Sequence, residues 1–241
     1  MNNDIASNLQ KISSRIEKTC TRCKRDPAEV KLLLATKTVS ARRIKEALLA
    51  GQTLIAENKV QELKEKFESL QDIPHTDHFI GHLQSNKIKD ILKYGVSCIQ
   101  SLDRLSLAEK LQQRLDLEDR SMEVFIQVNT SNEDSKYGVH PALAIELVKE
   151  IAKFPRVQVK GLMTIGLFSG EAVKVRRCFR LLKSIQQEIL ALNIPGVEMN
   201  ELSMGMSNDF EIAIEEGATM VRVGTAVFGR RKYPDSYYWS G

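Results

Sequence analysis

Lys37 is the residue of this sequence that is best placed for covalent chemistry. It ends the apolar run Lys31–Lys37, and in a strand it would share a face with Leu33 and Ala35, so its side chain is predicted to point inward. Burial lowers the pKa of an amine, and an amine with a low pKa can attack an aldehyde. The alternative is an edge lysine whose amine reaches water at the end of the strand.

Two later segments are suited to binding a phosphate group. Ser207 is predicted to cap a helix that starts with Asn208 and Asp209, and the start of a helix attracts anions. Gly224 and Thr225 would add backbone N–H groups and a hydroxyl. Each residue could instead be only a cap or only a turn, but Lys37 and Arg222 near the same place favour a joint site.

The cysteines and histidines do not predict a metal site. Cys20 and Cys23 have zinc or redox spacing, but no second pair follows, so Cys20, Cys23, Cys98 and Cys178 are predicted to be free thiols. His75, His78 and His82 would gather on a helix. In the strand expected over His78–Leu83, however, His78 and His82 would lie roughly 13 Å apart, too far to share one ion.

Composition indicates a cytoplasmic globular protein. The sequence has neither a long apolar run nor a signal-peptide pattern at its start. Its net charge is only +4, and basic residues stand among acidic ones along the expected helices. This pattern is typical of solvated helix faces and argues against a nucleic-acid surface.

Strand-like and helix-like segments alternate along the whole chain. The expected strands are Lys31–Lys37, Thr53–Asn58, His78–Leu83, Ser97–Leu102, Glu123–Asn129, Val157–Gly166, Glu201–Gly205 and Met220–Phe228. The expected helices are Ile5–Cys20, Ala41–Ala50, Lys59–Leu70, Asp103–Leu115, Pro141–Lys153, Glu171–Leu192 and Asn208–Glu216. Such alternation predicts a single (β/α)8 TIM barrel, α/β in class, because it implies parallel strands. An open doubly wound sheet is the alternative, weakened by the lack of a glycine-rich dinucleotide turn.

We expect one domain over residues 1–241, with an N-terminal helix in 1–23 and a C-terminal tail in 230–241. In such barrels the active face lies at the carboxyl ends of the strands. Those ends carry Lys37, Asn58, Met163, Arg222 and the glycine-containing run from Ser203 to Ser207.

Six segments together resemble a known family. They are Leu34–Thr38, Glu57-Asn58, His78–Lys87, Gly161–Ile165, Leu202–Asp209 and Val221–Gly229. They are similar to the pyridoxal phosphate homeostasis proteins, the single-domain relatives of the alanine racemase N-terminal barrel. The resemblance covers almost the whole chain and is weakest over the aromatic tail.

The resemblance implies a cofactor and assigns residues to it. Lys37 would carry pyridoxal 5'-phosphate as an internal aldimine, and Arg222 would face the pyridine nitrogen. Asn58 and Met163 would line the ring. The phosphate would be bound by Ser207, Gly224 and Thr225.

Arg222 then argues against a committed reaction, and we assign no catalytic residue. An arginine is always charged and only donates hydrogen bonds, so it would leave the ring nitrogen unprotonated and the ring a weak electron sink. Racemases of this class, by resemblance, add a tyrosine base from a second domain, and this sequence ends soon after its eighth strand. We therefore predict a monomeric carrier of the cofactor in vitamin B6 homeostasis, with apo enzymes that need pyridoxal phosphate as recipients.

Two other functions stay open on the sequence. An amino-acid racemase would need a base from the tail, where Tyr233, Tyr237 and Tyr238 are the candidates. A lysine aldolase on the same barrel would form its bond with a sugar phosphate in place of pyridoxal phosphate.

Overall fold

Parallel strands close into a barrel in the order of the chain. The computed structural model describes residues 4–133 and 136–229, and in it each strand pairs with the next and the last pairs with the first. The strands are β1 (Lys31–Ala35), β2 (Leu54–Glu57), β3 (Thr76–Phe79), β4 (Cys98–Leu102), β5 (Met122–Gln127), β6 (Val157–Met163), β7 (Val197–Ser203) and β8 (Met220–Val223). The predicted (β/α)8 barrel is therefore confirmed, and the open sheet is wrong.

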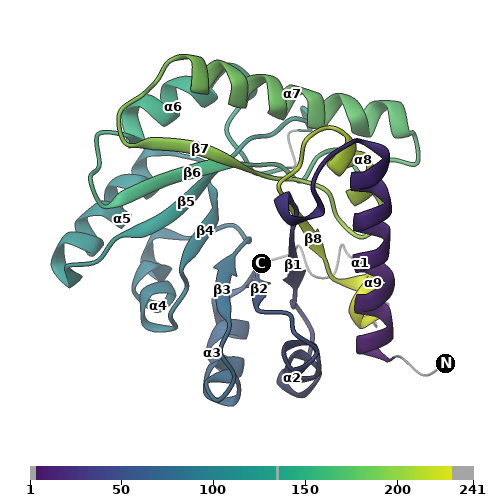
Figure 1. The fold of residues 1–241 in the computed structure, drawn as a ribbon. Coiled ribbons are helices and arrows are strands. Elements are labelled where there is room, and N and C mark those ends of the chain that lie inside the picture. Colours follow the sequence, from purple (N-terminus) through teal and green to yellow (C-terminus); the bar gives the residue numbers. More distant parts are fainter. Residues whose placement is uncertain (1–3, 134–135, 230–241) are drawn as a thin grey trace.

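Helices surround the barrel on its outer side (Figure 1). They are α1 (Ile5–Arg22), α2 (Ala41–Leu49), α3 (Val60–Leu70), α4 (Ile88–Lys93), α5 (Leu105–Glu118), α6 (Ala144–Ile151), α7 (Ala172–Ala191), α8 (Phe210–Glu215) and α9 (Thr225–Phe228). Short 3-10 turns cover Pro27–Glu29, Ser85–Lys87 and Pro141–Leu143.

The N-terminal helix lies against the last part of the chain. The side chain of Asp4 caps α1 by accepting a hydrogen bond from the N–H of Ala6 at 3.1 Å. Ile5, Leu9 and Ile12 recur at helical spacing and are buried, so α1 has one apolar face. That face packs against α2, α8 and α9, as Figure 1 shows for the purple helix beside the yellow segments.

Two groups of apolar side chains fill the fold. The smaller one lies inside the barrel and consists of Leu33, Ala56, Cys98, Phe125, Met163 and Met220. The larger one lies between the strands and the helices and includes the neighbours of Leu33 on β1, Leu32 and Leu34. This alternation fixes which strand residues face the barrel interior, since successive side chains of a strand point to opposite faces.

Several predicted element boundaries were wrong. The third strand is Thr76–Phe79, so His78 lies on it but His82 lies in the following loop, and the 13 Å estimate assumed a strand that continues beyond Phe79. The eighth strand ends at Val223, where a glycine interrupts it and α9 begins. The short helix α4 was not predicted. Among the residues that the structure describes, no group of three histidine, cysteine or acidic side chains could hold a metal ion.

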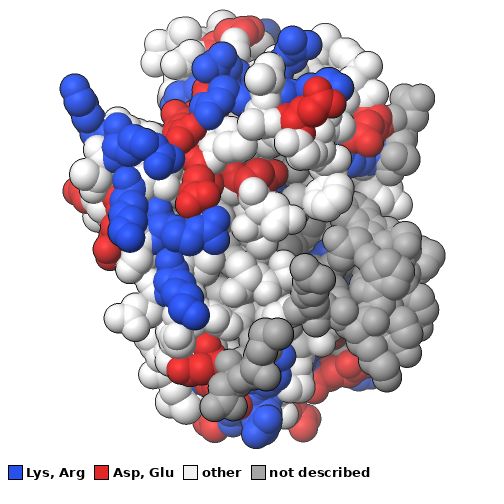
Figure 2. All heavy atoms as spheres, turned by 90° about the vertical axis from the view of Figure 1, so that its right-hand side faces the viewer, with Lys and Arg blue, Asp and Glu red and all other residues white. Residues whose placement is uncertain are grey.

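Charged side chains of both signs share the surface. Figure 2 shows lysine and arginine beside aspartate and glutamate on the described part of one face. On this side of the molecule Arg15 of α1 pairs with Glu211 of α8 at 3.1 Å, and Arg22 pairs with Glu215 at 2.6 Å. Such exposed pairs contribute little stability. None of the helices described is both long and apolar enough to cross a membrane.

Candidate functional site

The predicted site residues lie at or near the carboxyl ends of their strands. Lys37 lies in the turn two residues after β1, and Asn58 follows β2 directly. Met163 is the last residue of β6 and packs inside the barrel, and Arg222 lies within β8. The strand β8 pairs with β1 in parallel, and Arg222 is the register partner of Leu33. The carboxyl ends of the first and last strands are therefore neighbours.

The turn that carries Lys37 is tightly held. Thr36 before it is fully buried, and its Oγ1 donates to the carbonyl of Ala56 at 3.0 Å and to Glu57 Oε1 at 2.6 Å. Thr38 after it has a φ of +65°, a left-handed conformation that β-branched residues rarely adopt. Lys37 itself is half-buried.

Ser207 does not cap the helix that follows it, so that part of the prediction was wrong. The helix α8 starts later, after Asp209, and the Oδ1 of Asp209 accepts a hydrogen bond from the N–H of Met206 at 2.5 Å. The Oγ of Ser207 instead accepts from the N–H groups of Gly224 and Ala226, both at 3.3 Å. The sequence could not reveal this because the competing partners lie on the loop after β8.

Gly224 is required at this point by close packing. A Cβ placed on it would lie 2.9 Å from the carbonyl oxygen of Ala35, which belongs to β1. The neighbouring Thr225 opens α9 and is partly exposed. Ser207, Gly224 and Thr225 therefore place two hydroxyls and the backbone N–H of Gly224, which Ser207 Oγ accepts, at one spot, and hydroxyls and backbone N–H groups are the kinds of donor that bind oxyanions in proteins.

Arg222 is a buried cation. Its side chain donates from Nη1 to Ser203 Oγ at 2.8 Å and from Nη2 to the carbonyl of Thr164 at 2.7 Å, and neither acceptor carries a charge. Burial lowers the pKa of Arg222 to about 10, while Asp209 acts in the opposite direction. The guanidinium thus keeps its positive charge at neutral pH and brings it to the mouth of the barrel.

A chain of buried polar groups runs from Arg222 across the barrel interior. The Oγ of Ser203 donates to Gln100 Oε1 at 2.6 Å, and Gln100 Nε2 lies 2.7 Å from His78 Nδ1. Burial is the main reason that the pKa of His78 is lowered to about 4, so this imidazole is neutral. Sequence reasoning did not connect Gln100 and His78 with Arg222, and only the barrel brings these residues together.

Asn58 offers an unused polar group at the opening. Its Oδ1 is buried and has no hydrogen-bond partner among the described residues. An amide of this kind is normally satisfied by a neighbour, by water or by a ligand. The tail tyrosines Tyr233, Tyr237 and Tyr238, which a racemase would need, lie outside the described residues.

The cysteines are free thiols, as predicted. All four are free; Cys20, Cys98 and Cys178 are buried, and Cys23 is partly exposed at the end of α1. Burial raises the pKa of Cys20 and raises that of Cys98 strongly, which makes both thiols poor nucleophiles.

Comparison with known proteins gives one consistent family. The family model described as alanine racemase, N-terminal domain, matches residues 5–232. A pyridoxal phosphate homeostasis protein of Aquifex aeolicus is 43% identical over 93% of this chain and 97% of that protein. One of Escherichia coli K12 is 40% identical over 96% of this chain and 98% of that protein. The solved structure of PipY from Synechococcus elongatus PCC7942 with pyridoxal phosphate bound has a TM-score of 0.81 and 33% identity, covering 93% of this chain and all of that one.

Proposed function

Because this chain belongs to the family of pyridoxal phosphate homeostasis proteins, we propose that it binds pyridoxal 5'-phosphate and takes part in vitamin B6 homeostasis without a committed reaction of its own. The observation that carries this proposal is the cofactor bound to PipY, a relative with the same barrel over the same length. The amine of Lys37 would hold the cofactor covalently as a Schiff base, with loss of one water.

The residues at the barrel mouth fit such a ligand. Ser207, Gly224 and Thr225 would hold the phosphate, with the hydroxyls of Ser207 and Thr225 as donors. Ser207 Oγ accepts from the N–H of Gly224 and so has its own hydrogen to give to the ligand. Asn58 and Met163 would line the ring, and the unpartnered Oδ1 of Asn58 supports a polar contact with a ligand there. When bound, the cofactor supplies an aldehyde and a ring that can withdraw electrons.

Arg222 supports a carrier in preference to a catalyst. It would face the pyridine nitrogen with a group that only donates hydrogen bonds, so that nitrogen would stay unprotonated. A protonated nitrogen is what makes this ring a strong electron sink. Its bonds to Ser203 and Thr164 hold the guanidinium in place, so the effect does not depend on a mobile side chain.

Cellular context is part of the proposal. Four free thiols are typical of a reducing compartment, which supports the cytoplasm. We infer that apo enzymes that use pyridoxal phosphate are the recipients and that the protein acts as a monomer. Analytical ultracentrifugation with and without the cofactor would test the monomer.

Absorption spectroscopy with borohydride reduction tests the proposed function. The purified protein incubated with pyridoxal phosphate should show a visible band that borohydride bleaches, and peptide mapping should place the label on Lys37. Lys37→Ala should lose the band and keep its circular dichroism, whereas Lys64→Ala, which removes an exposed lysine of α3, should keep both.

Three results would contradict the proposal. A label on another lysine would remove Lys37 from its role. Sustained deuterium exchange at the α-carbon of alanine would favour a racemase. A sugar phosphate trapped by borohydride would favour an aldolase.

A further inference from the structure

Behind the turn that carries Lys37 lies a buried cluster of charged side chains. Lys66 of α3 donates from Nζ to Glu57 Oε1 at 2.7 Å and to Glu62 Oε2 at 2.6 Å. Glu57 is 2% exposed and Lys66 is 8% exposed. The cluster lies on the outer side of the sheet, because Glu57 alternates with Ala56, whose side chain is inside the barrel.

The cluster binds the backbone on both sides of Lys37. Lys66 Nζ donates to the carbonyl of Thr36 at 3.0 Å. Glu62 Oε2 accepts from the N–H of Thr38 at 2.6 Å. Glu57 Oε1 also accepts from the hydroxyl of Thr36, so all three charged residues contact a neighbour of Lys37.

These contacts hold a conformation that the chain would not adopt alone. Thr38 has a φ of +65°, and a threonine in this region is strained by its branched side chain. Strained residues persist only where the surroundings fix them, and they concentrate at functional sites. The N–H of Thr38 points to the carboxylate of Glu62, which fixes the direction of the turn.

Burying these charged groups costs desolvation free energy. The cluster contains two carboxyl groups and one ammonium, burial raises the pKa of Glu57 to about 7, and the Oε2 of Glu57 is buried without a hydrogen-bond partner among the described residues. Apolar side chains of similar size often stabilise a protein core at least as well as buried ion pairs. The stability of the fold alone therefore does not explain why charged residues occupy this position. Their contacts with Thr36 and Thr38 do explain it.

We propose that Lys66, Glu57 and Glu62 are positioning residues for Lys37. They fix the peptide groups before and after it, and so set the direction in which its amine leaves the backbone toward the aldehyde. They act through the backbone, because they lie on the face of the sheet opposite the barrel interior. This inference rests on the proposed function of Lys37.

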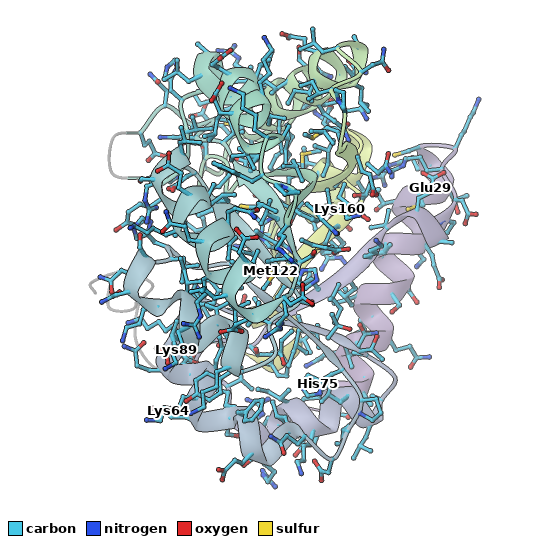
Figure 3. The ribbon with its side chains drawn as sticks, turned by 90° about the vertical axis from the view of Figure 1, so that its left-hand side faces the viewer. Glu29, Lys64, His75, Lys89, Met122 and Lys160 are labelled. Carbon is cyan, nitrogen blue, oxygen red and sulfur yellow. The ribbon has the colours of Figure 1, made fainter. Side chains whose placement is uncertain are left out.

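Binding measurements with two ligands can distinguish a role in positioning Lys37 from a role in stabilising the fold. Pyridoxal 5'-phosphate can bond to the Lys37 amine, whereas pyridoxine 5'-phosphate has an alcohol in place of the aldehyde and cannot. Lys66→Met should slow covalent attachment of the first by at least about tenfold, a barrier increase of about 1.4 kcal/mol, and change the Kd of the second by less than about twofold. The matched control is Lys64→Met on the exposed side of the same helix, at the edge of the molecule in Figure 3, which should change neither.

A second pair of variants covers the case in which Lys66→Met fails to fold. Glu62→Gln keeps an oxygen that can accept the N–H of Thr38, and should retain most of the attachment rate. Glu62→Leu removes that acceptor and should lose most of the attachment rate. Amide hydrogen exchange at Thr38 should also become faster in the cofactor-free protein.

The outcomes are distinguishable. A parent protein that forms no bond at Lys37 overturns the proposed function and this inference with it. A parent that forms the bond, with Lys66→Met and Glu62→Leu equally fast, overturns only the positioning role. If the variants weaken the binding of both ligands equally, the cluster stabilises the fold and does not position Lys37.

Discussion

The Nη1 of Arg222 donates a hydrogen bond of 2.8 Å to the Oγ of Ser203, and this one bond orders a whole row of buried groups. Because arginine only donates, the hydroxyl of Ser203 must accept here and give its own hydrogen to Gln100. The amide of Gln100 then turns its NH2 group to His78 Nδ1, which must be unprotonated. Hydrogen-bond donation by Arg222 thus determines, through Ser203 and Gln100, which nitrogen of His78 is unprotonated.

Stability should depend on pH through His78. Its folded pKa is about 4 against an ordinary value of 6.5, so between these values the unfolded chain binds the proton more tightly. The stabilisation is complete above pH 6.5 and is lost as the pH falls toward 4, by about 3 kcal/mol in total. Urea unfolding from pH 7.5 to 4 should show this loss in the parent relative to His78→Gln, which keeps an acceptor for Gln100. Parallel curves for the two proteins would refute the assignment.

Gln100→Leu should interrupt the row of hydrogen bonds. Ser203 Oγ and His78 Nδ1 would lose their partner inside the barrel, at a cost of about 1–3 kcal/mol for each buried group left unsatisfied. The free energy of unfolding from urea titration measures the loss. Gln113→Leu on the exposed side of α5 makes the same chemical change outside the barrel and should be nearly neutral. A loss as small in Gln100→Leu as in this control would contradict the row.

Ser207→Ala should weaken cofactor retention and cost about 1 kcal/mol of stability, because the N–H groups of Gly224 and Ala226 lose their acceptor. Thermal unfolding without the cofactor isolates the structural part, and equilibrium dialysis with pyridoxal phosphate gives the binding part. If stability falls while affinity stays the same, Ser207 only joins the two loops and does not bind phosphate.

Arg222→Glu tests why this protein would carry the cofactor without transforming amino acids. A carboxylate facing the ring nitrogen could keep it protonated and restore the electron sink, so exchange of the α-proton of alanine should become faster than in the parent. The variant is compared only if its circular dichroism and its Schiff-base absorbance match the parent, because a buried glutamate near the carbonyl of Thr164 can disturb β8. Arg222→Gln serves as the uncharged control. Exchange no faster in Arg222→Glu would show that Arg222 does not restrain the chemistry.

The barrel could be predicted from the sequence because local signals repeat along it. Runs such as Leu32–Leu34 indicate buried strands, and the amphipathic segments between them indicate covering helices, so order and closure follow from simple alternation. The ends of several strands were predicted wrongly. The apolar residues after Phe79 continue the strand pattern, but Gly81 lies against the carbonyl of Asn58, where a Cβ would be 1.9 Å away, and the chain has already left the sheet.

The polar interior could not be predicted for a different reason. His78, Gln100, Ser203 and Arg222 lie on four strands, and no spacing in the sequence relates them. The contacts of Lys66 were missed likewise, since a lysine on an amphipathic helix normally reaches solvent. Hydrogen bonds between distant segments depend on the register of the closed barrel, which a pattern of hydrophobicity does not specify.

Because Gly224 lies against Ala35, the site spans the junction where the first and last strands meet. During synthesis on the ribosome, Lys37 emerges early, but the residues that would hold the phosphate and the ring nitrogen emerge almost last. If Lys37 and these residues hold the cofactor as proposed, a nascent chain would have the amine long before it has the groups for the phosphate. The complete site would then form only once the barrel has closed, so occupancy would mark a chain that has finished folding.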